Sequence, residues 1–391
     1  MKRLQQMRGY RTPLVAALLV LTLSSAASDS AISVHLSPEQ NVVFRWASDR
    51  CADDDIPDAP ARAFRDADGV VHLLAPHYDN RAFTVLNGVP KRLDCRLVLD
   101  SPGDADPAHY RDRRWITATW TDDGKTVHAL VHHEYQGQRH PGACTFPGYT
   151  SCWYNVITYA RSDDGGRSFT QSDPPAVVAA PPFRQDVGQG RPRGFFNPTN
   201  ILKRGAYWYA LIQTTGWDEQ PAGSCLFRTS DLAKPELWMA WDGQAFATRF
   251  GDPYRSGAPA GANATCKPVT PRAFGSMLAI EGTDLTIATF LRESGDAERR
   301  SWMLAYSLSS DLITWSAPVD LEPLRYFGSK DCGDTSRYGY PALLDLNTTS
   351  RNFDMIGKDA MLFLTRFNVR GCRNSMDRDL VARPIKISPQ P

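Results

Sequence analysis

Polar clusters stand where the apolar runs of this sequence begin and end, and they carry side chains that can transfer protons or bind anions. Five clusters follow apolar runs: HYDNR at 77–81, HHEY at 132–135, QTTGW at 213–217, LRES at 291–294 and TRFN at 365–368. Five more, rich in arginine and acid, precede apolar runs, at 51–60, 110–114, 185–196, 263–272 and 332–339. Arginine binds carboxylates in a forked geometry, and carboxylates accept hydrogen bonds from sugar hydroxyls. The clusters therefore favour a site for a hydroxyl-rich or anionic substrate.

Asp58 and Glu134 are the candidate catalytic pair among these residues. A carboxylic acid can protonate a leaving oxygen while a second carboxylate acts as base or nucleophile. Glu134 ends an apolar strand, where burial would raise its pKa and keep it protonated. As alternatives, Glu134 is an ion-paired structural residue and Asp58 caps the following turn. Glu293 is a third catalytic candidate, with a surface ion pair as its alternative, and Asp79 is a substitute base.

Nine residues are candidate substrate contacts: Arg62, His77, Asp79, His133, Arg193, Asn197, Trp217, Tyr338 and Arg366. Two of these arginines would clamp an anion, and the two aromatic residues would stack on a sugar ring. The histidines would contact substrate or, as a lesser alternative, hold a central metal ion. Packing inside the fold is the other interpretation of the histidines and aromatic residues. Neither a G-x-G-x-x-G segment nor a Walker loop occurs, and we expect no metal ion and no cofactor.

The acids of YARSDDGGRSFTQ, at 159–171, have a different interpretation. The segment from Ser162 to Phe169 fits the pattern S-x-D-x-G-x-[ST]-[FW], called an Asp-box. In such a turn the aspartate accepts hydrogen bonds from backbone N–H groups, and glycine takes a positive φ. We therefore expect Asp163 and Asp164 to be structural. Looser versions of the pattern occur at 229–238 and 309–315.

Five units, each with a short apolar run, a turn and a longer run, recur at 59–83, 115–137, 197–217, 274–295 and 340–368. Radial repetition protects the edges of four-stranded sheets, so the repeat favours an all-β, five-bladed β-propeller. The last unit supplies three strands, ending at 380–387. We expect the strand at 41–46 to pair with it and close the ring, which makes residues 28–391 one domain. Long runs with helical periodicity are absent.

The first 27 residues have the character of a cleaved export signal, with basic residues before a ten-residue apolar run that is too short to span a bilayer. The formal net charge of the whole chain is +1, which gives no general attraction to nucleic acid. Eight cysteines follow the signal, at 51, 95, 144, 152, 225, 266, 332 and 372. In an exported chain an even number favours disulfides over metal binding. Pairing in sequential order keeps each bridge within one blade or between neighbours.

The turn motifs and the repeat resemble those of the five-bladed glycoside hydrolases (arabinanases, xylosidases and invertases) and, more distantly, of sialidases. PDAPARAFRDADGVVHLLA, at 57–75, resembles the opening of blade one in both groups, and Asp58 stands near the general base of the five-bladed enzymes. Two departures matter. Asn197 stands where those glycosidases carry their acid glutamate, and Asp58 stands where sialidases carry the first arginine of a triad, with Arg62 four residues later. The catalytic sets of these families therefore do not transfer whole.

Three functions are compatible with these patterns. The first is an exported, monomeric hydrolase that acts on a poly- or oligosaccharide, secreted or periplasmic. The second is a propeller that binds glycans or protein without catalysis, which the Asn197 departure favours. The third is polysaccharide lyase or esterase chemistry with His133 as base and Tyr338 as acid. The sequence leaves open the sugar, the linkage and the stereochemical outcome.

Overall fold

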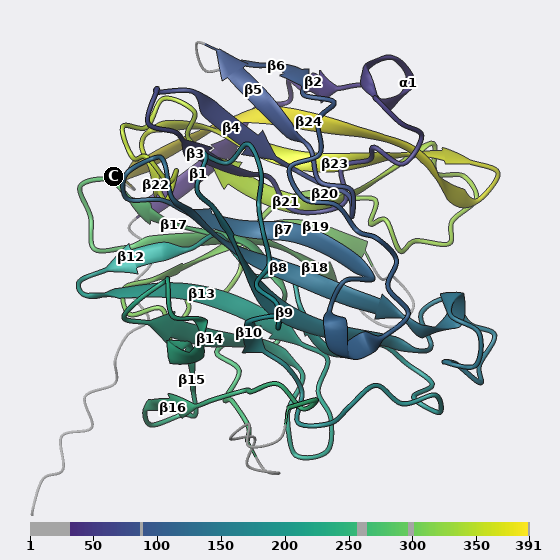
Figure 1. Cartoon of the computed structure of the whole chain (residues 1–391). Coiled ribbons are helices and arrows are strands. Elements are labelled where there is room, and N and C mark those ends of the chain that lie inside the picture. The colour runs from purple at the N-terminus through teal and green to yellow at the C-terminus, as the bar shows by residue number, and fades with distance from the viewer. Residues whose placement is uncertain (1–31, 87–88, 256–263, 296–300, 390–391) are drawn as a thin grey trace, which may run out of the picture.

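The computed structural model describes residues 32–86, 89–255, 264–295 and 301–389, and the expected export signal lies outside them. Nearly all regular structure is β (Figure 1). Among the described residues the helical elements are single turns: α1 (Trp46–Asp49), η1 (Pro107–His109), η2 (Gly137–Arg139) and η3 (Pro235–Leu237). No helix among them is long and apolar enough to cross a membrane. The all-β class expected from the sequence is confirmed.

The first sheet is a four-stranded meander in which each strand pairs antiparallel with the next. Its strands are β3 (Arg62–Arg65), β4 (Val71–Leu74), β5 (Ala82–Leu86) and β6 (Val89–Leu93). Phe64 and Leu74 from this sheet pack against Ile116 and Val127 of the following sheet. The contact places the first repeat directly beside the second.

The second sheet has ten strands and combines the second and third repeats. It contains β7 (Arg113–Trp120), β8 (Val127–Gln136), β9 (Trp153–Ser162), β10 (Val177–Ala179), β11 (Arg193–Phe196), β12 (Leu202–Arg204), β13 (Tyr207–Thr214), β14 (Gly223–Thr229), β15 (Met239–Trp241) and β16 (Phe246–Thr248). Strand β11 joins the two halves, since it runs parallel to β9 and antiparallel to β13. The junction needs Gly194, with φ of +112°, because a Cβ there would lie 2.0 Å from the Asn155 carbonyl oxygen.

The third and fourth sheets contain the last two repeats. The third has β17 (Phe274–Ile280), β18 (Thr286–Ser294), β19 (Ser301–Ser309), β20 (Val319–Leu324) and β22 (Met355–Ile356), the last parallel to β17. The fourth has β21 (Ser336–Leu344), β23 (Asp359–Arg370), β24 (Arg373–Pro389) and both N-terminal strands, β1 (Ile32–Leu36) and β2 (Asn41–Phe44). Asn41, Val42 and Phe44 pair with Ala382, Val381 and Leu380. This is the pairing expected between 41–46 and 380–387.

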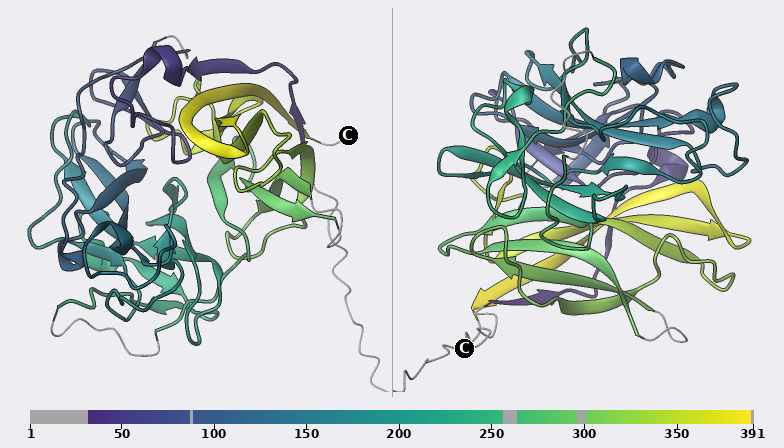
Figure 2. Two further views of the ribbon diagram at one scale, coloured as in Figure 1. Left: turned by 90° about the vertical axis from the view of Figure 1, so that its right-hand side faces the viewer. Right: turned by 90° about the horizontal axis from the view of Figure 1, so that it is seen from below.

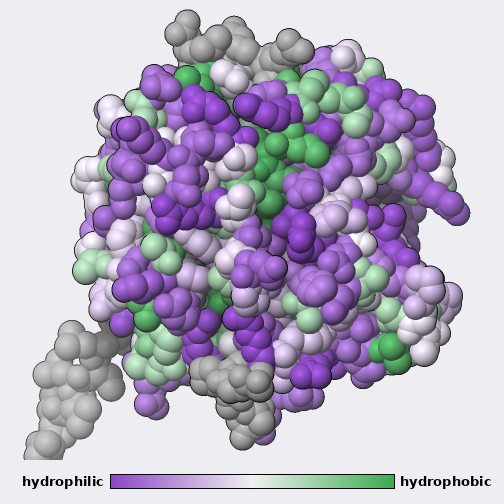
Figure 3. Space-filling model, in the orientation of Figure 1, coloured by the Kyte–Doolittle hydropathy of each residue, from purple (hydrophilic) through white to green (hydrophobic). Residues whose placement is uncertain are grey.

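Apolar side chains link the sheets in a cycle. Leu211 of β13 packs with Met277 of β17, and Leu304 of β19 packs with Leu362 of β23. The fourth sheet then packs on the first, because one cluster contains Phe44, Leu73, Phe83 and Phe363 together. Figure 2 (left) shows the sheets grouped around a common centre. The face in Figure 3 is mostly hydrophilic, with a hydrophobic area in its upper half.

Arg62 lies at the meeting point of several sheets. Its side chain is 2% exposed, and its guanidinium donates hydrogen bonds to the carbonyl oxygens of Thr117 (2.7 Å), Pro198 (3.0 Å) and Gly275 (2.8 Å). Burial lowers the pKa of Arg62 to about 9. These carbonyls belong to the beginnings of the second, third and fourth repeats, so one side chain ties four repeats together.

The acids of the 159–171 segment have the turn geometry that the sequence predicts. Asp164 accepts hydrogen bonds from the Ser168 N–H (2.9 Å) and from the hydroxyls of Ser162 (2.7 Å) and Ser168 (2.6 Å). Asp163 is exposed and pairs with Arg161 (2.6 Å). Phe169 is buried behind the turn. Asp311 makes a similar turn further along the chain, accepting the N–H groups of 313 and 314.

All eight cysteines form disulfides in the predicted order, and the described residues include no free cysteine. The bridges are Cys51–Cys95, Cys144–Cys152, Cys225–Cys266 and Cys332–Cys372. Each closes a loop of neighbouring sequence, and none crosses the molecule. Four disulfides are typical of a protein of an oxidising, extracellular compartment.

Candidate functional site

Asp58 lies in the segment that leads into β3, with its side chain 18% exposed. Its Oδ1 pairs with Arg378 of β24 and accepts a hydrogen bond from the Tyr340 hydroxyl of β21 at 3.1 Å. The Nε2 of His77 lies 3.9 Å from Oδ2. Burial raises the pKa of Asp58, while the charge of Arg378 and the hydrogen bonds from Tyr340 and Arg378 act to lower it. The first and last sheets thus form one environment around this carboxylate.

Tyr340 holds an uncommon backbone conformation at this contact. Its φ is +54°, in the left-handed region, which costs a non-glycine residue on the order of 1 kcal/mol or more. Its ring stacks near Phe327 at 5.5 Å, and burial, followed by the charge of Asp58, raises the pKa of the phenol well above its usual value. The surrounding packing therefore maintains a strained residue whose hydroxyl binds Asp58.

Glu134 lies near the end of β8 and is 4% exposed. The Gln136 side-chain amide, two residues further along the same face, donates to its Oε1 at 2.5 Å. Burial raises the pKa of Glu134 to about 8; the Gln136 hydrogen bond opposes this rise, whereas the charges of Asp58 and Asp112 add to it. The two candidate carboxyls therefore influence each other electrostatically. The direction of this pKa shift is the one expected for an acid at the end of an apolar strand.

Aromatic and imidazole rings line the space around the two carboxyls. The indole of Trp115, on β7, stacks on His132 of β8 with centroids 5.6 Å apart, and its edge meets His77 at 6.1 Å. Tyr78 lies against both His77 (3.8 Å) and Trp115 (6.1 Å). Arg113 stacks over Tyr78 at 4.2 Å. The rings form a wall of mixed polar and aromatic character.

Both histidines of this wall are neutral at physiological pH. Burial lowers the pKa of His77 to about 3, with the charge of Arg378 adding to the effect. Burial also lowers the pKa of His132 to about 4, although hydrogen bonding with Asn155 and Asn197 acts in the opposite direction. The Asn155 oxygen lies 2.9 Å from His132 Nε2. Uncharged imidazoles suit hydrogen bonding to a neutral, hydroxyl-rich molecule.

Four predicted site residues come together in this region: Asp58, Glu134, His77 and Asn197. Asp79 stays half-exposed near it and accepts the Ser101 N–H at 3.3 Å. Burial and the charge of Asp54 raise the pKa of Asp79. These residues come from segments that lie as much as 139 positions apart in the sequence.

The histidine predicted at the site from β8 is the wrong one of an adjacent pair. His133 is 0% exposed, and its Nε2 accepts the Asp112 N–H at 3.2 Å on the opposite side of the strand from Glu134. Successive strand residues point to opposite faces, so Glu134 shares its face with His132 and Gln136. His132, and not His133, lies on the wall around the carboxyls. The expected roles of His133 as substrate contact or base are not compatible with its position on the other face of β8.

Two other predicted contacts are buried in the framework. Arg62 donates its hydrogen bonds to backbone carbonyls, as described above, and Trp217 is 4% exposed in an aromatic cluster with Phe183, Phe195 and Phe250. Neither presents a surface to a substrate. Packing, the alternative interpretation given for Trp217, describes it correctly.

The remaining predicted residues lie outside the carboxyl environment. Arg366 is bound by Asp379 at 2.6 Å, and Arg193 stacks over Phe183 at 4.1 Å. Tyr338 packs at the edge of the apolar cluster between the third and fourth sheets. Glu293 is exposed on β18 opposite Trp302, and its neighbour Arg292 pairs with Asp320. The contacts of these four residues are with partners other than Asp58 and Glu134.

Several residues of the site were missed from the sequence: Tyr78, Arg113, Trp115, His132, Gln136, Tyr340 and Arg378. Gln136 and His132 could have been found from the two-residue period of a strand, starting at Glu134. Tyr340 and Arg378 carry no such signal. They lie 282 and 320 positions from Asp58 and reach it only through the packing of the last sheet on the first.

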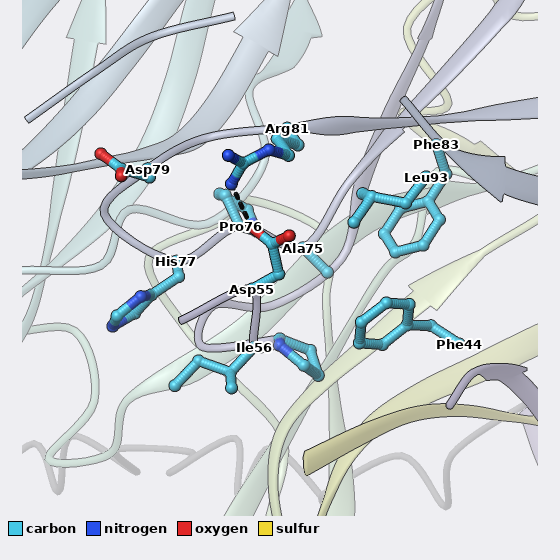
Figure 4. A pocket seen from close by; sticks show the side chains of 11 residues that line it. Phe44, Asp55, Ile56, Ala75, Pro76, His77, Asp79, Arg81, Phe83 and Leu93 are labelled. Atoms are coloured by element: carbon cyan, nitrogen blue, oxygen red, sulfur yellow. Dashed lines mark hydrogen bonds and ion pairs between the residues drawn. The ribbon is translucent and has the colours of Figure 1, made fainter. Parts of the chain in front are cut away.

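A separate small pocket lies behind His77, between the first and fourth sheets. Figure 4 shows Asp55 and Arg81 facing each other in its wall, with Phe44, Phe83 and Leu93 on the other side. Asp55 also accepts hydrogen bonds from the backbone N–H groups of 51 and 52 at 2.7 Å. Its carboxylate is therefore bound by the protein itself. Neither Asp58 nor Glu134 lines this pocket, whereas His77 and Asp79, the substitute base, both do.

The described residues contain no group of three or more His, Cys, Asp or Glu side chains that could hold a metal ion.

Comparison with solved structures finds carbohydrate-active enzymes of the same fold class. The chain is similar to sucrose-6-phosphate hydrolase from Lactobacillus gasseri, with 10% identity, a TM-score of 0.43 and coverage of 85% of this chain and 62% of that one. It is similar to the Bombyx mori GH32 β-fructofuranosidase, with 13% identity, a TM-score of 0.44 and coverage of 91% and 66%. It is also similar to the Cellvibrio cellulosa α-L-arabinanase, with 11% identity, a TM-score of 0.42 and coverage of 83% of this chain and 90% of that one.

These three proteins are carbohydrate hydrolases by name, and they are 10%, 13% and 11% identical to this chain. This chain spans less than two thirds of the length of the first two of these proteins. No protein-family model matches the sequence, and no curated protein is significantly similar to it.

Proposed function

We propose that this protein is an exported glycoside hydrolase that cleaves a poly- or oligosaccharide. The observation that carries the proposal is the shared, largely buried environment of Asp58 and Glu134, in which each carboxyl has a different partner. Glu134 accepts only the neutral amide of Gln136 and keeps its proton. Asp58 is paired with Arg378, whose charge opposes the rise in pKa that burial causes. Glycoside hydrolysis requires one protonated and one ionised carboxyl, and the mechanism assigns the proton to Glu134.

In this mechanism Glu134 donates its proton to the oxygen of the scissile bond. Asp58 then acts from the other side of the sugar, either as the nucleophile or as the base that activates water. Tyr340 and Arg378 hold Asp58 in place, and the ring of Trp115 with the neutral imidazoles of His77 and His132 surrounds the sugar. Asn197, at the position where related enzymes carry an acid, orients His132 and does not transfer protons.

The scaffold proposed for this site is a five-bladed propeller, residues 28–391, with the second and third blades joined through β11. The N-terminal strands complete the last blade by pairing with β24. Deleting residues 28–46 should lower the melting temperature by several degrees or prevent folding, because both β1 and β2 would be lost from one edge. An unchanged melting curve for the truncated protein would contradict the closure.

The test of function is a glycan panel. Purified mature protein is incubated with plant, fungal and bacterial polysaccharides and their oligosaccharides, and products are analysed by chromatography. Hydrolysis by the wild type together with its loss in Glu134→Gln and Asp58→Asn supports the proposal. Hydrolysis that persists in both variants would exclude this site as the source of activity.

Glycan binding without catalysis is the second candidate, and one observation favours it. Asp58 is already bound by Arg378 and Tyr340, as a structural carboxylate would be. A binding propeller would retain affinity for the same glycans in Glu134→Gln and produce no cleavage in any variant. The lyase alternative is not supported, because His133, its expected base, is buried on the other side of β8.

A further inference from the structure

A loop closed by a short disulfide stands beside Glu134. It follows β8 and η2, and it is closed by Cys144–Cys152, two cysteines that are only eight positions apart. The backbone N–H and the hydroxyl of Thr145 both donate to the Val187 carbonyl, at 2.9 Å and 3.0 Å. The Gln185 amide donates to the Ala143 carbonyl at 2.8 Å. The loop is therefore fixed at its base and to the segment before β11 (Figure 1, where β8 ends).

Three large apolar side chains are exposed on this fixed structure: Phe146 (43%), Tyr149 (58%) and Val187 (42%). Among the described residues only five others of this kind are exposed, and they are scattered over distant parts of the sequence, namely Val42, Leu97, Leu237, Met355 and Met376. Exposed apolar groups that are concentrated and rigidly held commonly mark a binding surface. We call these three residues the apolar rim.

The rim is continuous with the site through Tyr149. The ring of Tyr149 rests edge-on against Trp153, with centroids 5.0 Å apart, and leaves most of its surface free. Trp153 pairs with Gln136 across β8 and β9, which places Tyr149 close to Gln136. Burial raises the pKa of Tyr149, the charge of Glu134 adds to this rise, and hydrogen bonding with Gln136 opposes it. Gln136 is also the residue that donates to Glu134. The exposed ring and the proton donor are thus separated by a single side chain.

The rim lies on the Glu134 side of the site. Arg378, Tyr340 and His77, which contact Asp58, come from the first and fourth sheets and not from the sheet that carries Glu134. A general acid must reach the oxygen of the group that departs, so the sugar nearest to Glu134 is the leaving group. Rings of sugars expose C–H groups that pack well on rigid aromatic faces, and tyrosine provides such a face at low entropic cost.

We propose that Phe146, Tyr149 and Val187 form a leaving-group subsite, which binds the sugar ring that is released with the oxygen protonated by Glu134. This assignment rests on the proposed hydrolase function, because the role of Glu134 as general acid defines which side holds the leaving group. Such a subsite would make the protein selective for substrates that carry a sugar beyond the cleaved bond. The Cys144–Cys152 bridge keeps the rim in register with Glu134.

The test compares two substrates of one sugar, an oligosaccharide from the panel and the corresponding glycosyl fluoride, whose fluoride leaving group cannot reach the rim. Tyr149→Ala should reduce kcat/KM for the oligosaccharide by roughly tenfold or more, within the range for loss of one apolar pocket contact. The same substitution should leave kcat/KM for the glycosyl fluoride nearly unchanged, so the loss is specific to the oligosaccharide. Tyr149→Phe should restore most of the oligosaccharide activity, because it keeps the ring.

Leu237→Ala is the matched control, since Leu237 is 38% exposed and lies on η3, outside the rim. Hydrolysis by the wild type, with Tyr149→Ala behaving like Leu237→Ala or losing both substrates equally, would overturn the subsite and leave the hydrolase intact. If no substrate is cleaved, calorimetric titration with the same oligosaccharides gives the answer. Weaker binding by Tyr149→Ala and Phe146→Ala then supports the rim without the hydrolase, and unchanged or absent binding overturns it.

Discussion

Asp164 and Glu134 are both acids at the ends of neighbouring strands, β9 and β8, yet their surroundings are opposite. Asp164, in its turn, accepts two hydroxyl hydrogen bonds and the Ser168 N–H, and these outweigh partial burial and lower its pKa. Glu134 accepts one amide hydrogen bond in a buried position, and its pKa is raised to about 8. The comparison teaches that the number of donors around an acid, more than its place in the sequence, separates a structural carboxylate from a candidate acid catalyst.

The largest expected effect is on turnover by Glu134→Gln. Removal of a proton donor typically reduces the rate by about a hundredfold or more. The amide is nearly isosteric, so the melting temperature at neutral pH should not fall. Steady-state kinetics and thermal melting of the same preparation measure both quantities. Activity that survives in this variant would remove Glu134 from the mechanism and end the contrast with Asp164.

The pH dependence of turnover sharpens the same contrast. A proton donor with a pKa of about 8 is lost as the pH rises through that value, so kcat/KM should decline above it. The acid side of the profile reports Asp58, which must be ionised. Arg378→Gln removes the charge that lowers the pKa of Asp58, and the acid limb should therefore move to higher pH. If the acid limb stays at the same pH in Arg378→Gln, then Arg378 does not lower the pKa of the group that controls this limb.

Stability should respond to pH with opposite signs at the two acids. The folded-state pKa of Glu134 lies above its unfolded value of 4.5, so the folded state binds an extra proton between pH 4.5 and about 8 and is progressively destabilised across that interval. Glu134→Gln should therefore gain melting temperature relative to wild type as the pH increases to 8. For Asp164 the pKa is lowered, so its stabilisation is present above the unfolded value of 3.8 and disappears as the pH falls. Parallel melting curves across pH for wild type and variants would contradict both assignments.

The smallest effect is expected for Asp164→Ala, which should destabilise the fold by about 1 kcal/mol through loss of the turn hydrogen bonds. Turnover per folded molecule should be unchanged. Asp163→Ala is the adjacent control, because Asp163 is exposed and only pairs with Arg161, and its effect should be smaller than half of this. Denaturant unfolding measures both. A loss of turnover in Asp164→Ala at full folding would place that turn in the active machinery.

The sequence predicted those features that depend on neighbours along the chain. The turn acids and the cysteine pairs follow from local pattern and short connections. The 41–46 pairing is long-range and was expected instead from the strand that the last repeat lacks. The candidate acid Glu134 followed from its position at the end of an apolar strand. The choice of His133 over His132 was an error of strand face, which the two-residue period would have corrected.

The partners of Asp58 could not be predicted in this way. No motif or spacing in the sequence marks Tyr340 or Arg378. They contact Asp58 only because the fourth sheet packs against the first. Trp217 failed for the converse reason, since an aromatic residue at a strand end serves packing and stacking equally well until burial is known. Residue type fixes what a side chain can do, and tertiary packing decides which of those uses is available.

Arg62 has a consequence for how the chain reaches its native state. Its three long-range hydrogen bonds span 55, 136 and 213 positions, so no two neighbouring repeats can supply all of its acceptors. A half-assembled molecule would hold a desolvated cation with missing carbonyls, and such a species is unfavourable. The guanidinium therefore penalises partial assembly and makes the repeats fold as one cooperative unit, unlike open repeat arrays, in which each unit contacts only its neighbours.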